Sequence, residues 1–355
     1  MSQYEKALLD ADTPVLRAAL SVQRSYVLVT DNVSGDVHRF DNQTAFWGHW
    51  KSKSGGKLKE WNDERAEAGL EPFPPEQFSL QEYTEMQPDI DDPIEKAIEQ
   101  FDFFVGRIKK YGFAKDYVLG IGGEGNFRKD IAQILPYKGM RKDKPILFNE
   151  VKEAIIRKYK SKVVISNNQE VDDWVGIEGF SNYKNFVRTG KWKNIIGFCD
   201  KDLAQIISPQ FNYLDDNAKV FIPTPEDAAR AFAVQLLCGD KGTDNIPGLP
   251  NFTDEIRSKY GLKKTKGIGK ASALKCLETS ADIKEMFFRV VEAYRGFYGD
   301  DKREFTSWRG ETFMWNWLDF LQDNAQLLWL RREEGEMYHI CNTLDRLGIE
   351  YEKAN

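Results

Sequence analysis

The stretch Asn194-Ile195-Ile196-Gly197-Phe198-Cys199 runs directly into Asp200-Lys201-Asp202. A short apolar run of this kind predicts a buried strand, and this strand is followed at once by two carboxylates. The run Ala7-Leu8-Leu9-Asp10 repeats the pattern near the N-terminus. Two buried strands that each lead into an acid favour a sheet that gathers carboxylates along one edge.

Strand-like and helix-like segments alternate outward from these two runs. Apolar runs predict strands over residues 117–121 and 163–166, and helical spacing predicts helices over 93–110, over 147–159 and from about Val171. Strands that alternate with helices predict an α/β fold with a mainly parallel central sheet flanked by helices. Active sites in such sheets lie beyond the carboxyl ends of the strands, where Asp10, Asp200 and Asp202 fall.

The remaining segments suggest how the chain is divided. Residues 26–30 and 37–40 flank Ser34-Gly35-Asp36 and predict a hairpin, whereas residues 51–92 are polar and proline-rich and predict an irregular insertion. From about Thr224 onward the pattern is mostly helical. We therefore expect an α/β domain over residues 1–222 and a helical region over residues 223–355.

Composition limits the classes of protein that the chain can represent. Among its 355 residues 41% are hydrophobic and 30% charged, which is typical of a globular protein. No apolar run is long enough to span a membrane, and the N-terminus has no signal-peptide pattern. The four cysteines are far apart, so we expect reduced thiols in a cytoplasmic protein. With only three histidines, a His-based zinc site or a Ser-His-Asp triad is disfavoured.

Acidic side chains recur where the predicted elements meet. Glu170-Val171-Asp172-Asp173 opens a helix, and Asp240 and Asp244 precede the turn Asn245-Ile246-Pro247-Gly248. Each group alone is explained by helix capping or by a solvated surface. Together they favour a cation site, because clustered carboxylates without His or Cys suit Mg²⁺ or Mn²⁺. We expect two Mg²⁺ ions, replaceable by Mn²⁺, that support phosphodiester hydrolysis.

A glycine-rich basic turn follows the acidic segments. Lys266-Gly267-Ile268-Gly269-Lys270 precedes a predicted helix. Glycines let backbone N–H groups approach a phosphate, and a helix N-terminus favours an anion. Such a turn is by itself more often an ordinary loop. Its place after the acidic segments favours contact with a nucleic-acid backbone despite the net charge of −6.

Taken in order, these motifs resemble the 5′-nuclease superfamily of flap endonucleases and 5′→3′ exonucleases, most closely its bacteriophage exonucleases. The matching segments run from about residue 7 to residue 278: Leu8-Leu9-Asp10 with Arg17, Phe127-Arg128-Lys129, Pro136-Tyr137-Lys138-Gly139-Met140-Arg141, Glu170-x-Asp172-Asp173, Asp200-Lys201-Asp202, Gly239-Asp240 through Gly248, and Gly267-Ile268-Gly269-Lys270. Each motif alone is weak, and their common order makes the resemblance specific.

The resemblance implies a PIN-like 5′-nuclease core with a helical arch at about residues 124–150 and a helix-three-turn-helix at about 239–278. It implies that one metal environment comprises Asp10, Glu170, Asp172, Asp173 and Asp200, and that Asp202, Asp240 and Asp244 complete a second. It assigns catalytic positions to Lys138 and Arg128, with Arg128 and Arg141 on phosphates. The remaining DNA-binding positions are Lys201, Gly248, Gly267, Gly269 and Lys270.

Three departures from the family pattern concern the metal ligands and the DNA-binding region. The family has an aspartate after its second strand, whereas here the nearest acid is Glu124, at a shifted position. Either Glu124 replaces that aspartate as a metal ligand, or this ligand is absent. Asp240 and Asp244 are one residue further apart than usual. Residues 249–266 appear as an insertion in the helix-three-turn-helix.

The resemblance implies a metal-dependent 5′→3′ exonuclease with flap endonuclease activity, serving DNA replication or degradation of the phage type. Its expected partner is DNA with a 5′ end or 5′ flap, with RNA–DNA hybrid as a further substrate. We expect a monomer, in the host cytoplasm if phage-encoded. Two alternatives remain open: a catalytically silent nucleic-acid-binding relative, and a PIN-like ribonuclease.

Overall fold

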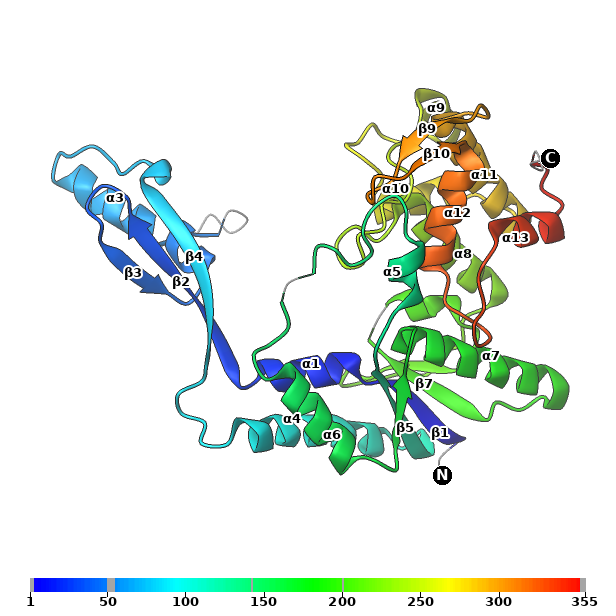
Figure 1. Cartoon of the computed structure of the whole chain (residues 1–355), viewed down its shortest axis with the longest axis horizontal. Helices are drawn as coiled ribbons and strands as arrows, with labels where there is room; N and C mark the ends of the chain where they lie inside the picture. Colours follow the sequence, from blue (N-terminus) through cyan, green and yellow to red (C-terminus); the bar gives the residue numbers. More distant parts are fainter. Residues whose placement is uncertain (1–2, 50–54, 142, 200, 352–355) are drawn as a thin grey trace. The chain divides into compact units, whose positions relative to one another are not determined.

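A five-stranded parallel sheet lies at the centre of the fold (Figure 1). The computed structural model describes residues 3–49, 55–141, 143–199 and 201–351. The sheet order is β6-β5-β1-β7-β8. Its strands are β1 (Tyr4–Asp10), β5 (Ala114–Gly122), β6 (Val163–Ser166), β7 (Asn194–Phe198) and β8 (Gln210–Asn212). The predicted parallel α/β sheet is confirmed, and it includes the four strands expected from the apolar runs.

Helices flank the sheet and make up much of the rest of the described chain. Their bounds are α1 (Asp12–Leu20), α2 (Gln43–Trp47), α3 (Lys57–Glu67), α4 (Pro93–Tyr111), α5 (Phe127–Ile131), α6 (Phe148–Lys158), α7 (Val171–Thr189), α8 (Pro225–Cys238), α9 (Asp254–Tyr260), α10 (Lys270–Leu277), α11 (Ile283–Tyr298), α12 (Trp317–Leu328) and α13 (Ile340–Leu347), with short 3-10 helices η1 (Pro75–Gln77) and η2 (Lys201–Gln205). None of the described helices is both long and apolar enough to cross a bilayer.

Close packing at Gly120 places α7 against the sheet. Strand β1 pairs with β5 so that Asp10 lies opposite Gly120, and a Cβ at Gly120 would come within 2.5 Å of the Trp174 ring. A glycine is therefore needed for Trp174, in the first turns of α7, to reach the sheet. Val171, Trp174 and Leu8 share one buried cluster. The acidic start of α7 is held near the carboxyl end of β1 by this packing.

The chain divides into two compact units. One comprises residues 1–13, 105–143 and 159–355, and the other comprises residues 14–104 and 144–158. The first unit contains the parallel sheet and a helical core to which α8, α10, α11, α12 and α13 all contribute buried side chains. The helical region expected from residue 223 onward thus belongs to the same compact unit as the sheet.

The second unit contains a small antiparallel sheet of order β3-β2-β4, formed by β2 (Gln23–Asp31), β3 (Val37–Phe40) and β4 (Phe78–Met86). The predicted hairpin is confirmed as β2–β3. The prediction that residues 51–92 are irregular was wrong, because α3 and β4 lie within them. Strand β4 carries polar side chains at most of its positions, since much of it is exposed, and therefore lacks the apolar run that marks a buried strand.

The segment expected to form a helical arch is mostly loop. Within residues 124–150, helix is found at Phe127–Ile131 and from Phe148 onward, while residues 132–141 and 143–147 form turns and coil. The inserted residues 249–266 contain the short helix α9, and α10 then packs on α8. The sequence departure in this region is therefore an added helix between the two helices that pack together.

A further pair of strands, β9 (Arg303–Thr306) and β10 (Thr312–Trp315), forms a separate hairpin in the first unit.

Candidate active site

Carboxylates from two elements lie near one tyrosine beyond the carboxyl end of β1. Asp10 ends β1 and is almost fully buried, and its Oδ1 accepts a hydrogen bond from the Asp12 backbone N–H at 3.0 Å. Tyr213 lies beside it, with its hydroxyl 3.1 Å from the Asp10 carbonyl oxygen. Burial raises the pKa of Tyr213 far above its usual value, and the negative charges of Asp10 and Asp172 raise it further. Asp10 and Asp172 therefore both lie near one buried hydroxyl.

The first turn of α7 is fixed by its own acids. The Glu170 backbone N–H donates to Asp173 Oδ2 at 3.0 Å, which satisfies one of the free N–H groups at the helix start. Asp172 occupies the same turn, where the positive end of the helix dipole favours a carboxylate. The local sequence thus explains both why the helix begins here and why three acids can cluster at its start.

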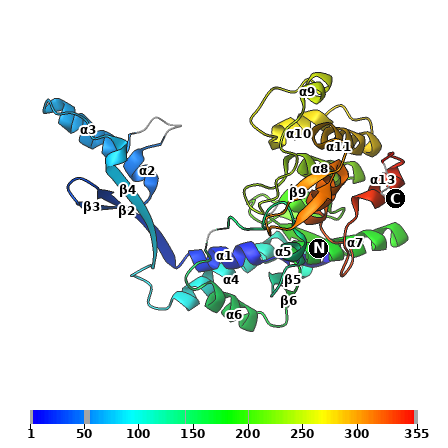
Figure 2. The same cartoon turned by 45° about the horizontal axis from the view of Figure 1, so that its top comes forward.

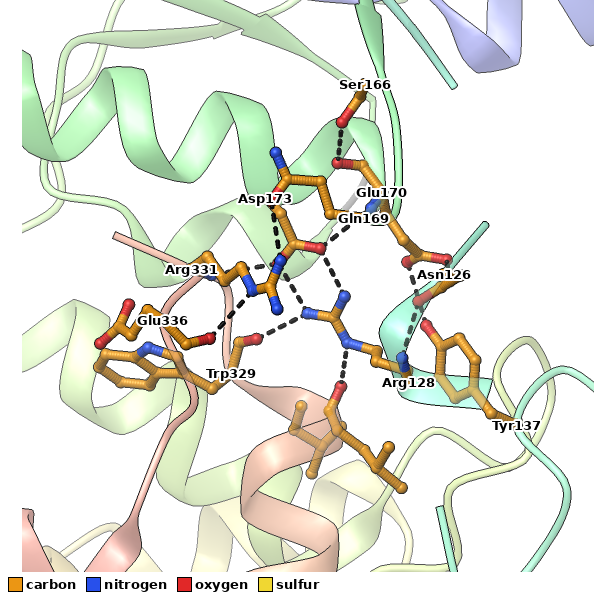
Figure 3. A network of polar contacts seen from close by, with 12 residues as sticks. Asn126, Arg128, Tyr137, Ser166, Gln169, Glu170, Asp173, Trp329, Arg331 and Glu336 are labelled. Carbon is orange, nitrogen blue, oxygen red and sulfur yellow. Dashed lines mark hydrogen bonds and ion pairs between the residues drawn. The ribbon is translucent and has the colours of Figure 1, made fainter. Parts of the chain in front are cut away.

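Asp173 forms a buried ion pair with Arg128, as Figure 3 shows. Nη1 and Nη2 of Arg128 lie 2.5 and 2.8 Å from the Asp173 oxygens. Nε donates to the Leu327 carbonyl, and Nη2 also donates to the Trp329 carbonyl. Burial alone would raise the pKa of Asp173, but the charge and hydrogen bonds of Arg128 outweigh burial and lower that pKa. The Arg331 backbone N–H also donates to Asp173.

This pairing differs from the roles expected for both residues. Arg128 is 1% exposed, so its guanidinium is not placed to contact a phosphate. Asp173 is 0% exposed, and both its carboxylate oxygens accept hydrogen bonds from the protein. In this structure the pair joins α5, α7 and the segment after α12, and we assign it a structural role.

A second acidic group is formed by Glu170 and Asp244 around Lys138. The Lys138 ammonium forms an ion pair with Glu170 and lies 3.6 Å from Asp244 Oδ1. The hydroxyl of Tyr137 lies 3.0 Å from Glu170 Oε2 and 2.9 Å from Asp244 Oδ2. Asn126 donates to Glu170 at 2.8 Å. The two carboxylates are therefore bridged by one hydroxyl and one ammonium group.

The protonation of this group follows from burial and charge. Burial would raise the pKa of Glu170, but Lys138 and Arg128 outweigh it and lower that pKa. For Asp244, burial prevails over the attraction of Lys138, and the neighbouring charge of Glu170 adds to it, so its pKa is raised. Lys138 thus holds a negative charge on Glu170 within a mostly buried cluster.

Backbone geometry fixes the Lys138 loop on the same cluster. Lys138 has a positive φ of 58°, a conformation that costs a non-glycine residue energy unless the surroundings hold it. Its N–H donates to the Asp244 carbonyl at 2.9 Å, and the Asn245 side chain donates to the Pro136 carbonyl at 2.9 Å. Residues 136–141 are therefore attached to the segment that carries Asp240 and Asp244.

The other predicted metal ligands lie in different surroundings. Asp202 accepts a hydrogen bond from the Gln235 side chain at 2.7 Å, and Asp240 accepts one from the Thr243 N–H at 3.1 Å. Glu124 is exposed, on a loop whose backbone bonds to Asn168. Asp200 lies outside the described residues, as does the side chain of Lys201.

The donor chemistry suits a hard divalent cation, since the acids here offer oxygen atoms alone. Across the described ranges, however, no group of three or more acidic, His or Cys side chains is arranged to hold one metal ion. Asp10 and Asp172 both lie near the Tyr213 hydroxyl, beyond the carboxyl end of β1. They fit as part of a cation site to which further oxygen donors must be added.

The predicted DNA-binding positions fall into two groups. Gly267 has a positive φ of 84°, and Gly269 caps α10 without a side-chain hydrogen bond, so the helix start presents backbone N–H groups. Lys270 is exposed at the same place. Gly248 differs from the expectation: it is buried, and its N–H donates to the Asn324 side chain at 2.9 Å. Arg141 is 52% exposed and pairs with Asp244 at 3.2 Å.

Lys270→Ala is expected to weaken DNA binding to a similar degree for every sequence, because a phosphate contact carries no base information. The slope of log K against log salt should become shallower by about one unit. Fluorescence anisotropy with one duplex over a range of NaCl concentrations measures this slope. Lys275→Ala, on the same helix and engaged with Glu278, is the matched control. An unchanged slope in Lys270→Ala would contradict phosphate contact there.

Reasoning from the sequence missed several side chains that shape the site. Tyr137 is part of the motif that contains Lys138 but received no role from the sequence, yet it bridges two carboxylates. Tyr213 and Asn126 contact Asp10 and Glu170 from distant segments. Tyr137 could have been found from its position beside Lys138, whereas no local pattern marks Tyr213.

Comparison with known proteins gives matches among solved structures only. No family model and no curated protein matches the sequence. The bacteriophage T5 D15 protein co-crystallised with metal ions is similar over 55% of this chain and 81% of its own, at 14% identity and a TM-score of 0.34. The T5 D15 flap endonuclease in a pseudo-enzyme–product complex with DNA and metal ions matches at 14% identity and a TM-score of 0.34, covering 65% and 90%.

A mutant of the T5 5′-exonuclease is similar at 13% identity and a TM-score of 0.32, over 65% of this chain and 92% of its own. These TM-scores lie below 0.5, so no residue of this chain is assigned a role from the similarity. These three solved structures are those of a phage flap endonuclease and 5′-exonuclease.

Proposed function

We propose that this protein is a divalent-metal-dependent 5′→3′ deoxyribonuclease that hydrolyses phosphodiester bonds near DNA 5′ ends, as an exonuclease and as a flap endonuclease. RNA–DNA hybrid is a further proposed substrate, and DNA replication or degradation of the phage type is the proposed role. The observation that carries the proposal is that Asp10, at the carboxyl end of β1, and Asp172, in the first turn of α7, both lie near the buried Tyr213 hydroxyl. Acids at this place can bind a divalent cation, and the cation can in turn act on a phosphodiester.

Each part of the site has a proposed task. Asp10, Asp172 and Asp200 would hold the catalytic Mg²⁺, with Asp202 and Asp240 as ligands of a second ion. When bound, Mg²⁺ supplies Lewis acidity that activates water and offsets charge on the phosphodiester. Mn²⁺ is expected to replace it. Glu170 forms an ion pair with Lys138, and Asp244 accepts a hydrogen bond from Tyr137. We therefore propose that these two acids orient the Lys138 loop.

The cationic side chains have tasks of their own in this proposal. Lys138 neutralises charge beside the scissile phosphate, and Arg141, half-exposed, binds a neighbouring phosphate. The start of α10 at Gly267, Gly269 and Lys270 holds the duplex backbone through N–H groups and positive charge. Arg128 and Asp173 support this arrangement from the interior.

Lys138→Ala is expected to lower turnover roughly 100-fold while weakening DNA affinity much less, because charge is stabilised mainly in the transition state. Single-turnover cleavage and anisotropy binding, measured in parallel, separate the two effects. Lys129→Ala is the control, since Lys129 is exposed and lies earlier in the same segment. An effect on affinity alone would make Lys138 a binding residue.

The experiment that tests the proposal compares three labelled substrates: a 5′-flap DNA, a nicked DNA duplex and a 5′-flap RNA. Each is incubated with Mg²⁺, with Mn²⁺ and with EDTA. Cleavage of the DNA substrates only when a metal is present supports the proposal. Binding without cleavage in both metals would indicate a silent nucleic-acid-binding relative. Cleavage confined to RNA would indicate a PIN-like ribonuclease.

A further inference from the structure

The small sheet of the second unit has two faces that differ in what covers them. Side chains alternate along each strand, so Val27 and Val29 on β2 face the same side as Phe78 and Leu80 on β4. These side chains pack with Phe46 of α2 and with Leu58 and Trp61 of α3, in one cluster. Both helices lie on that side of the sheet (Figure 2). The opposite face of the sheet is called the outer face below.

The outer face carries a stack of planar groups. Tyr26 and Tyr83 lie opposite each other across β2 and β4, with ring centroids 5.5 Å apart and planes 15° apart. The guanidinium carbon of Arg39 lies 3.6 Å from the centroid of the Tyr26 ring. Both tyrosines are partly exposed. A row of two aromatic rings and one guanidinium group on an open sheet is a surface on which further planar groups can stack.

The charges of the outer face favour an anionic ligand. Its charged positions on the three strands are Arg24, Arg39 and Glu85, so positive charge exceeds negative by one. Both arginines lie 2.7 Å from the same Glu85 oxygen. Hydrogen bonds from Arg39 and Arg24 lower the pKa of Glu85, which keeps the three charges in place. The arginine side chains are 50% and 45% exposed, which leaves N–H surface for phosphate oxygens.

We propose that the outer face binds single-stranded DNA, with bases stacked on Tyr26 and Tyr83 and phosphates held by Arg24 and Arg39. Aromatic rings bind bases with little sequence preference, and arginines supply the electrostatic part of the affinity. The inference rests on the proposed function, since a nuclease that acts near 5′ ends encounters unpaired 5′ strands. It gives the second unit the role of holding the single-stranded arm of the substrate.

The test measures binding of fluorescently labelled oligothymidylate to the full chain in EDTA, where no cleavage is needed. Tyr83→Ala is expected to weaken this binding roughly tenfold, as is typical for loss of one stacking ring. Tyr83→Phe should bind like the wild type, because the ring and not the hydroxyl is used. Thr84→Ala, one residue along the same strand with its side chain on the opposite face, is the matched control.

Arg39→Gln provides a second variant in case Tyr83→Ala unfolds the small sheet, since an exposed ion pair adds little to stability. It should flatten the salt dependence of oligothymidylate binding by about one unit. If folded Tyr83→Ala and Arg39→Gln both bind oligothymidylate with the affinity and salt slope of the wild type, the proposal is overturned. The outer face would then be a candidate surface for a protein partner. If the wild type cuts no substrate yet Tyr83→Ala still loses oligothymidylate binding, the proposed function fails while this inference stands.

Discussion

Asp172→Asn is expected to reduce Mg²⁺-dependent cleavage by roughly 10⁴-fold or more, while DNA binding is retained or becomes tighter. The substitution keeps the shape of the side chain and removes one negative charge from the first turn of α7. Losing that charge weakens cation binding, and it also removes repulsion towards the DNA phosphates. Loss of turnover with affinity intact is therefore the expected signature of a cation ligand.

Cleavage and anisotropy binding with the same flap substrate measure this separation. Asp254→Asn is the matched control, because Asp254 also lies in the first turn of a helix but is highly exposed. It should leave both cleavage and binding unchanged. Wild-type turnover in Asp172→Asn would remove Asp172 from the proposed cation site. A loss of turnover that is accompanied by a loss of thermal stability would show that Asp172 has a structural role.

Arg128→Met is expected to destabilise the fold by about 3–5 kcal/mol, because it leaves the carboxylate of Asp173 buried without its partner. The same change removes hydrogen bonds to the carbonyls of Leu327 and Trp329, which attach the end of α12 and the residue after it to α5. Urea unfolding followed by circular dichroism gives the free energy. Arg141→Met, which removes an exposed arginine, is the control and should change stability by less than about 1 kcal/mol.

A double variant tests whether the contributions of Arg128 and Asp173 to stability are coupled. Arg128→Met combined with Asp173→Asn should be destabilised by less than the sum of the two single variants, since no uncompensated charge remains. Additive losses would contradict the direct coupling seen in Figure 3.

The same pair predicts a pH dependence of stability. Asp173 has a lowered pKa in the folded protein, so its contribution is complete above its unfolded pKa of about 4. That contribution is lost as pH falls from about 4 through the folded pKa. The free energy of unfolding of Asp173→Asn should therefore fall less steeply than that of the wild type below pH 4.

Local patterns were sufficient to predict the central sheet but not all of the second unit. Four of the five parallel strands, β1, β5, β6 and β7, contain apolar runs and were found where those runs lie. Strand β8 is only three residues long and has no such run. Strand β4 is exposed along much of its length and carries polar side chains, so its sequence resembles a loop. Its position is set by pairing with β2, which the chain order alone does not reveal.

The site shows the same difference between local and distant information. Acids at strand ends and helix starts were found because each follows a local signal. Arg128 was assigned to a phosphate by the resemblance, through the segment Phe127-Arg128-Lys129. Its actual partners, Asp173 and the carbonyls of Leu327 and Trp329, lie far along the chain. The buried role of an arginine depends on such partners, which no short motif contains.

The most direct test of the proposed nuclease is cleavage of one 5′-labelled flap DNA by the wild-type protein, with the product length mapped on a sequencing gel. In Mg²⁺ we predict labelled fragments that end in the flap or close to its junction with the duplex, and in EDTA an intact substrate. A substrate that stays intact in both Mg²⁺ and Mn²⁺, while anisotropy shows that the protein binds it, would contradict the proposed activity.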